Sequence, residues 1–95
     1  MDNVFNSQVK MKYYILKCEY PPSSSYDNRP SYVQKIRECG FIGTADIKKA
    51  KGFSSLEAAI KGRDRILSKG KINDFLNTIV FKVVEVEYKI TILDA

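Results

Sequence analysis

The segment from Lys51 to Gly70, KGFSSLEAAIKGRDRILSKG, constrains the fold more than any other, because both ends and the buried side of a helix can be identified in it. Ser54 and Glu57 have the spacing of a capping box, in which each side chain accepts a hydrogen bond from the other residue's backbone amide. Gly70 can adopt the left-handed conformation that ends a helix. The apolar residues at helical spacing are Leu56, Ala59, Ile60, Ile66 and Leu67. The segment predicts a helix over about residues 55 to 69 with one side packed on a core.

Two residues inside this helix are unusual. Gly62 costs a helix about 1 kcal/mol relative to alanine, which indicates a close approach to another backbone. Arg63 lies on the same side as Leu56, Ile60 and Leu67. We therefore expect its stem to be packed while its guanidinium reaches an edge carboxylate or a partner.

The segments on either side of the helix show the two-residue alternation of β-strands. Lys12 to Tyr20 predicts a first strand, and its part from Tyr13 to Leu16 is apolar on both faces, as in an inner strand. Thr78 to Leu93 predicts the last strand. Its apolar residues change parity between Val83 and Val84, so either its first half is buried on both faces or a bulge shifts the phase.

Ser31 to Cys39 fits two structures. Its apolar residues match a short helix ending at Gly40, or a half-exposed strand. We favour the strand, because Phe41, Ile42 and Thr44 resemble the return arm of a hairpin. After it, TADIKKA predicts one helical turn capped by Thr44, with Ile47 and Ala50 pointing inward.

The other segments are irregular in pattern. Residues 1 to 10 are polar and aperiodic, which predicts a disordered leader before a single domain over residues 11 to 95. The run PPSSSYDNRP, residues 21 to 30, has the composition of an exposed loop. In KINDFLN, we expect Ile72, Phe75 and Leu76 to cover one end of the core. Together these elements predict an α+β domain, with a small, mostly antiparallel sheet of three to four strands and one main helix packed across a face.

Composition argues against enzymatic or metal chemistry. The chain has no histidine, the commonest general base and metal ligand, and its two cysteines form no metal-binding motif. The pattern predicts Cys18 as a buried apolar residue and Cys39 as an exposed thiol near a turn. Glu85 and Glu87 share a strand face, as any solvated pair would. We expect no enzyme, no cofactor and no metal, and regard a small enzyme using Cys39 or these carboxylates as remote.

No secretory signal or membrane-spanning apolar run is apparent, which predicts a cytoplasmic protein without a membrane partner. The net charge is +5, and the basic excess lies in and just before the central helix. Residues 48 to 71 contain two acidic residues, Glu57 and Asp64, and eight basic ones: Lys48, Lys49, Lys51, Lys61, Arg63, Arg65, Lys69 and Lys71. Such a surface attracts acidic protein patches or phosphate backbones.

We take these eight residues, with Tyr26 and Arg29 of the loop, as the candidate partner-binding set. The alternative for the basic helix is a solubilising face with Glu57 and Lys61 as an i, i+4 pair. The first functional hypothesis is docking on an acidic or nucleic-acid-binding surface of a protein. The second is weakly specific nucleic-acid binding. The sequence leaves the partner and the oligomeric state open.

The passage TADIKKAKGFSSLEAAI, followed by FKVVEVEYKI, resembles small α+β proteins encoded by bacteriophages and prophages. The shared pattern, T-x-D-x-x-x-A-x-x-F-S-S-x-E-A-A before a V-V-E-V-E strand, covers about half of the chain. It consists mostly of capping and core positions. The resemblance implies a host-cell protein that binds and inhibits a host protein, a class that includes anti-CRISPR and other anti-defence inhibitors. The PPSSSYDNRP insertion and Gly62 depart from that pattern.

Overall fold

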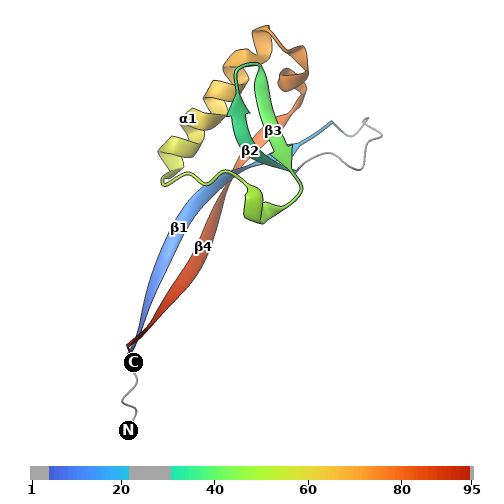
Figure 1. The fold of residues 1–95 in the computed structure, drawn as a ribbon. Helices are drawn as coiled ribbons and strands as arrows, with labels where there is room; N and C mark the ends of the chain where they lie inside the picture. The colour runs from blue at the N-terminus through green and yellow to red at the C-terminus, as the bar shows by residue number, and fades with distance from the viewer. Residues whose placement is uncertain (1–4, 22–30, 95) are drawn as a thin grey trace.

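The computed structural model describes residues 5–21 and 31–94, which form one antiparallel sheet with one main helix on a face (Figure 1). The strands are β1 (Phe5–Glu19), β2 (Tyr32–Arg37), β3 (Gly40–Thr44) and β4 (Val80–Asp94), in the order β3-β2-β1-β4. The helix is α1 (Leu56–Leu67), and the short 3-10 helices are η1 (Ile47–Lys49), η2 (Ser68–Lys71) and η3 (Asp74–Thr78). This architecture confirms the predicted α+β class, the four-stranded sheet and the single main helix.

The core lies between α1 and the sheet. On the covered face, Leu16 lies opposite Val83 and Cys18 lies opposite Phe81. Ala59 and Ile66 of α1 complete this cluster and are fully buried. Ile15 points to the other face and is also fully buried, which confirms the inner position predicted for residues 13 to 16.

The helix begins one residue later than the predicted cap. Ser55, not Ser54, accepts a hydrogen bond from the amide of Ala58 at 3.1 Å, and Glu57 pairs with Lys61 instead of reaching back to Ser54. The reason lies in the preceding residue, because Phe53 exchanges two backbone hydrogen bonds with Tyr14 of β1. Phe53 is thereby fixed on the sheet, and the turn into the helix follows it. The predicted capping box is wrong, although the helix itself is confirmed.

The buried side of α1 also differs from the predicted stripe. Ala59, Gly62 and Ile66 face the core, whereas Leu56 and Leu67 are 50% and 40% exposed. The buried side is narrow because Gly62 lets the helix approach closely: a Cβ there would lie 2.7 Å from two ring atoms of Phe53. The close contact is therefore with an aromatic side chain and not with another backbone. Leu56 and Leu67 fall on a flank of the helix that the sheet does not reach.

The sequence predicts that Gly70 ends the helix in a left-handed conformation, and this prediction is wrong. The chain passes directly from α1 into η2, and in the described part of the chain the glycine with positive φ is Gly40, at 157° in the β2–β3 turn. Gly70 is buried, and its carbonyl accepts a hydrogen bond from Nδ2 of Asn77 at 3.3 Å. A Cβ at Gly70 would collide with that Asn77 side chain. This glycine serves packing between η2 and η3.

Strand β4 pairs with β1 in one uninterrupted register, from Val80 opposite Glu19 to Asp94 opposite Phe5. The predicted bulge is therefore absent from the described pairing. Burial of the first half on both faces is also wrong, because Val80 is 55% exposed. The apolar pattern changes face within a regular strand. Phe81 and Val83 lie under α1, and the next apolar residues lie on the opposite face: Val84, Val86, Tyr88, Ile90 and Ile92.

The predicted disordered leader is wrong for residues 5 to 10. These residues form the first part of β1 and pair with residues 89 to 94 of β4. Residues 1–4 lie outside the described residues, as do 22–30, where Tyr26 and Arg29 of the predicted loop are found. We call residues 5–12 together with 87–94 the ribbon; it projects well beyond the helix-bearing part of the sheet (Figure 1).

The hairpin predicted after the loop is confirmed. Residues 32 to 37 are strand and not helix, and β3 returns antiparallel beside them, with Ile36 opposite Phe41. In the following turn the predicted cap is wrong. Asp46 accepts from the amide of Lys48 at 3.0 Å, while Thr44 Oγ1 accepts from the amide of Asp46.

Some apolar residues in the segments before and after α1 were expected to point inward, and only part of them do so. Ile47 of η1 is 45% exposed and Ala50 is half-buried. In the connection before β4, Leu76 is buried as predicted, but Ile72 and Phe75 are 75% and 48% exposed. Leu76 is the buried residue of η3, whereas η1 contains no buried residue.

Candidate interaction surface

The basic residues singled out in the sequence surround the helix. Lys48 and Lys49 lie in η1, Lys51 precedes α1, and the helix carries Lys61, Arg63 and Arg65. Lys69 and Lys71 lie in η2. Arg63 and Lys69 are half-buried and the other six are exposed. Tyr26 and Arg29 lie in the undescribed range 22–30.

Three of these residues form one row along α1 and its continuation. Lys61 and Arg65 are four residues apart, so they lie above one another on neighbouring turns of α1, and Lys69 follows four residues later in the 3-10 helix η2. At a rise of about 1.5 Å per residue, this basic row is about 12 Å long. Lys61 and Arg65 are exposed and lie away from Ala59 and Ile66, the residues that face the core, whereas Lys69 is half-buried. The row is the most regular charged feature of the helix.

The charges of the basic row are weakly compensated. Lys61 Nζ lies 3.6 Å from Glu57 Oε1, but these side chains are 75% and 80% exposed. Such an exposed i, i+4 pair contributes only about 0.3–0.5 kcal/mol and is easily exchanged for another partner. Arg65 and Lys69 form no ion pair with any residue in 5–21 or 31–94. The predicted i, i+4 pair is confirmed, yet it neutralises one charge of three.

The remaining basic residues do not gather into one compact patch with the row. Lys48 and Lys49 lie in η1, before the first turn of α1, whereas Lys71 lies beyond its last turn (Figure 1). Twelve helical residues, about 18 Å, separate these ends. Lys51 Nζ lies 5.6 Å from the ring centroid of Phe53, which fixes it over an aromatic face. The positive charge therefore extends along the helix.

Arg63 lies outside the basic row. It is half-buried on the flank that carries the exposed Leu56 and Leu67, as its spacing predicted. No ion pair with Arg63 occurs among the described residues, so its expected carboxylate partner is not found there. The flank combines a guanidinium with exposed leucines. Arginine is one of the residue types enriched at protein interfaces.

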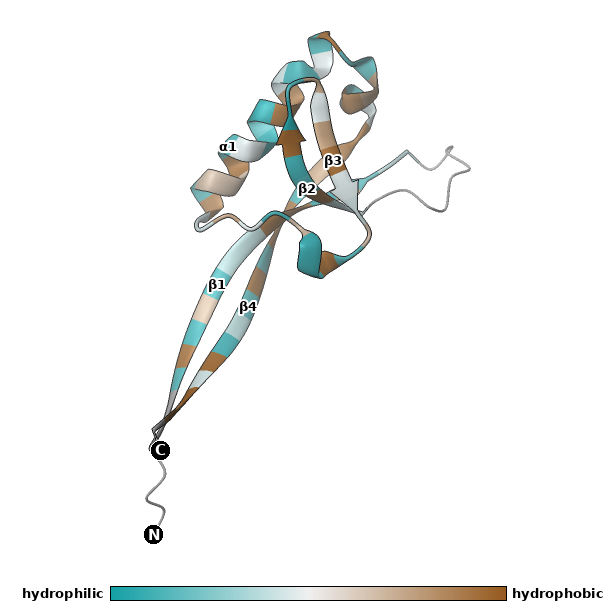
Figure 2. Cartoon of the chain, viewed as in Figure 1, coloured by the Kyte–Doolittle hydropathy of each residue, from teal (hydrophilic) through white to brown (hydrophobic). Residues whose placement is uncertain are grey.

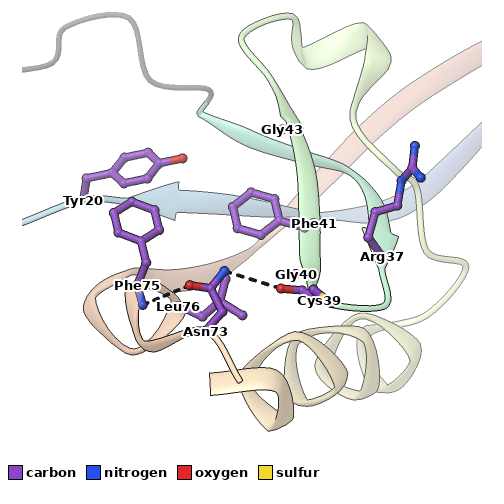
Figure 3. Close-up of a pocket in the computed structure, with 9 residues that line it drawn as sticks. All are labelled: Tyr20, Arg37, Cys39, Gly40, Phe41, Gly43, Asn73, Phe75 and Leu76. Carbon is purple, nitrogen blue, oxygen red and sulfur yellow. Dashed lines mark hydrogen bonds between the residues drawn. The ribbon is translucent and has the colours of Figure 1, made fainter. Parts of the chain in front are cut away.

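A cleft of about 460 Å³ lies between the β2–β3 turn and η3 (Figure 3). Sequence reasoning missed it, because its walls come from segments far apart in the chain. Its lining residues are Tyr20, Arg37, Cys39, Gly40, Phe41, Gly43, Asn73, Phe75 and Leu76. The rings of Tyr20 and Phe75 stack with centroids 6.4 Å apart. Asn73 uses both ends of its amide: Nδ2 donates to the carbonyl of Cys39 at 3.4 Å, and Oδ1 accepts from the amide of Phe75 at 3.2 Å. The cleft is mainly apolar, with the rings of Tyr20, Phe41 and Phe75 in its walls, and Arg37 is its charged group.

The carboxylates considered for catalysis have structural partners. Glu85 Oε1 accepts a hydrogen bond from the Tyr14 hydroxyl at 3.2 Å and lies 3.7 Å from Lys12 Nζ. Glu87 lies directly opposite Lys12 on the neighbouring strand. This arrangement is an exposed cross-strand charge network, which stabilises the pairing of β1 and β4 by a few tenths of a kcal/mol, roughly, for each pair.

The two thiols differ as the sequence predicted. Cys18 is buried in the core and Cys39 is exposed, and both are free. Burial raises the pKa of Cys18 from 9.0 to about 11, while a hydrogen bond with Tyr20 acts in the opposite direction. The thiol of Cys18 therefore stays protonated and unreactive at neutral pH.

We expect Ellman's reagent to modify Cys39 rapidly in the folded protein and Cys18 only after unfolding.

The free energy of unfolding should also fall as pH rises from 9 to 11, because the unfolded thiol of Cys18 ionises above 9.0 while the folded one stays neutral until about 11. Urea titrations of the wild type and Cys18→Ala across this range measure the effect, since the difference between the two proteins isolates the contribution of the thiol. An equal loss of stability in the two proteins would contradict it.

Neither a metal site nor a membrane-spanning helix is found in the described ranges. No group of three or more potential ligand side chains lies close enough together to hold a metal ion within residues 5–21 and 31–94. No helix there has both the length and the apolar character needed to cross a bilayer. Comparison with protein-family models, with curated proteins and with solved structures finds no match, so the interpretation of this surface depends on its own geometry.

Proposed function

We propose that this protein is a non-enzymatic binding protein that docks on an acidic or nucleic-acid-binding surface of a host protein and inhibits or modulates it. The basic row of Lys61, Arg65 and Lys69 is its contact surface, with Lys48, Lys49, Lys51, Arg63 and Lys71 extending the positive field to both ends of α1. The resemblance to small phage proteins supports a role in the host cytoplasm, of the anti-defence or anti-CRISPR type.

One observation carries the proposal: the cations of the basic row follow α1 and η2 in succession and are largely uncompensated. Arg65 and Lys69 form no ion pair within the described residues, and the pair of Lys61 is solvent-exposed. Charges of this kind lose little on transfer to a partner, because no strong internal contact must be broken. A complementary acidic surface would accelerate association and fix the orientation of the complex.

The test uses tagged protein to capture partners from a bacterial extract, followed by affinity measurement with the purified partner. Lys61→Glu combined with Arg65→Glu should weaken binding by at least about tenfold, which corresponds to about 1.4 kcal/mol. The matched control is Lys17→Glu with Lys35→Glu, which makes the same change in net charge at exposed strand positions. We expect this control to retain affinity.

Two results would count against the proposal. Full retention of the partner by the helix variant would place the interface elsewhere on the molecule. Alternatively, direct binding to generic duplex or single-stranded nucleic acid, with affinity falling steeply with salt and no protein partner needed, would favour the nucleic-acid hypothesis.

A further inference from the structure

We infer that the ribbon is a dimerisation surface, in which the free edge of β4 pairs antiparallel with β4 of a second copy of this chain about a twofold axis at Tyr88. The inference is independent of the proposed function, because it concerns the opposite end of the molecule from the basic row (Figure 1). It follows from the exposure of the ribbon, from its apolar face and from the order of charges along β4.

Within residues 5–21 and 31–94, no third strand or helix lies against the ribbon. Contacts from β2 and from Phe53 reach β1 only at Tyr14 and beyond, and the β1–β4 pairing continues alone to the tip. The longest dimension of the molecule is 62 Å, and its radius of gyration is 17.5 Å, against about 12 Å for a globular domain of this length. A two-stranded hairpin by itself is at best marginally stable in water. The ribbon therefore needs something to cover it.

One face of the ribbon is apolar and exposed. Cross-strand partners point to the same face, and Val9 lies opposite Ile90 while Met11 lies opposite Tyr88. These four side chains are 38–43% exposed, and Ile92 is 52% exposed. The alternation of apolar and polar bands along both strands is visible in Figure 2. The other face carries Lys10, Lys12, Glu87 and Lys89 among others, so the two faces differ as the inside and outside of a sheet do.

The outer edge of β4 is open to pairing. β4 is the last strand of the sheet, so its backbone groups on that side have no neighbouring strand among the described residues. Its sequence, VFKVVEVEYKITILD, has neither proline nor glycine, and its pairing with β1 shows no bulge. Natural edge strands are often protected from association by proline, by bulges or by charged side chains. β4 has neither proline nor a bulge, and its charged residues include both signs, so a strand of complementary charge can pair with this edge.

The charge pattern of β4 is complementary to itself. In antiparallel pairing about Tyr88, Glu87 lies opposite Lys89 of the second copy, and symmetry repeats the contact. In the same register Val86 lies opposite Ile90, and Val84 lies opposite Ile92. Centring the axis on Glu87 or on Lys89 would place like charges against each other. The pattern therefore selects a second copy of this chain as the occupant and selects Tyr88 as the centre.

This register also gives a partner to the most exposed large apolar residue of the ribbon. Leu93, 67% exposed, shares the helix-bearing face with Val83. Pairing about Tyr88 places Leu93 of the second copy opposite Val83, on the face where Leu56 and Leu67 of α1 are exposed. The dimer thus forms a continuous apolar face on one side of the joined sheets and covers an isolated leucine on the other.

The first experiment measures mass and dissociation by light scattering and sedimentation. We expect a species of twice the 10.9 kDa of one chain, dissociating on dilution. Lys89→Glu should raise the dissociation constant by about tenfold or more, because Glu87 then faces a carboxylate twice. Within one chain the same change is favourable, since position 89 lies opposite Lys10. Unfolding of the ribbon therefore cannot account for the loss.

Adding Glu87→Lys to Lys89→Glu should restore the dimer, because opposite charges again face each other across the axis. Lys35→Glu makes the same charge change as Lys89→Glu away from the ribbon and should leave the dissociation constant unchanged. A protein that is monomeric at every concentration, or a Lys89→Glu variant that dimerises as tightly as the wild type, would overturn the inference.

The second experiment locates the axis by disulfide cross-linking in a Cys39→Ser background. Residues on the axis face their own copies with Cα atoms roughly 4.5–5.5 Å apart, within disulfide reach. Tyr88→Cys should therefore cross-link under mild oxidation. Ile92→Cys should not, because its two copies would be about 27 Å apart. Cross-linking through position 92 instead, or capture of a strand from another protein by a monomer, would refute this pairing.

Discussion

Ile66→Ala is expected to lower the free energy of unfolding by about 3 kcal/mol, whereas Leu67→Ala, one residue further along, should lower it by less than about 1 kcal/mol. Ile66 is fully buried in the core cluster, so its truncation leaves a cavity, while Leu67 is 40% exposed on the flank of α1. Urea denaturation followed by circular dichroism measures both values. A small domain has a total stability of only about 5–15 kcal/mol, so the first change removes a large fraction of it.

Comparing Ile66→Ala with Leu67→Ala tests the structure against the helix predicted from apolar spacing alone. In that predicted helix both side chains face the core. Leu56→Ala provides a second exposed control, since this side chain is 50% exposed. Because the dimer would also contribute to stability, the measurements are made below the dissociation constant or compared at equal concentration. Equal losses for Ile66→Ala and Leu67→Ala would show that α1 is rotated relative to this structure.

Gly62→Val is expected to destabilise the protein by at least about 2 kcal/mol, through overpacking. A Cβ at this position would lie 2.7 Å from Cε1 and Cζ of Phe53. The ring is buried, and its backbone is held by hydrogen bonds of 2.7 and 2.9 Å to Tyr14, so it cannot move aside easily. Thermal and urea unfolding of the variant measure the effect.

A double-mutant cycle assigns the effect of Gly62→Val to this contact. Phe53→Ala alone should cost about 3–5 kcal/mol by leaving a cavity beside α1. In the double variant the valine enters that space, so the combined loss should be smaller than the sum by about 0.5–3 kcal/mol. Strict additivity of the two changes would mean that Gly62 is required for another reason.

The elements of the fold were largely predictable from sequence, because period and turn chemistry are local properties. The hairpin of β2 and β3 followed from alternation on both sides of Gly40, and the helix followed from its spacing. Errors arose where a distant residue decides a local choice. Ser54 and Ser55 are equally good caps by type, and the bridge between Phe53 and Tyr14 selects the second.

The ribbon could not be predicted for a related reason. Residues 5 to 10 are polar and aperiodic when read alone, and they become a strand only because β4 continues beside them. The change of apolar parity at Val83 and Val84 is the available signal, but read alone it predicts burial on both faces or a bulge. It marks the point where the strand leaves the cover of α1 and turns its apolar side the other way.

For the interaction surface, sequence reasoning predicted exposure and charge but not arrangement. Lysine and arginine are almost always solvated, so their exposure was a safe expectation. Their distribution along α1, and the cleft between the β2–β3 turn and η3, depend on how distant segments meet.

The pairing of Phe5 with Asp94 has a mechanical consequence. When tension is applied to residues 5 and 94, it acts across the end of the β1–β4 ladder, so the interstrand hydrogen bonds are loaded one after another, as in a zipper. The strands should peel apart from the tip at low force, and resistance should rise abruptly only where the advancing fork meets Tyr14 and the helix above it.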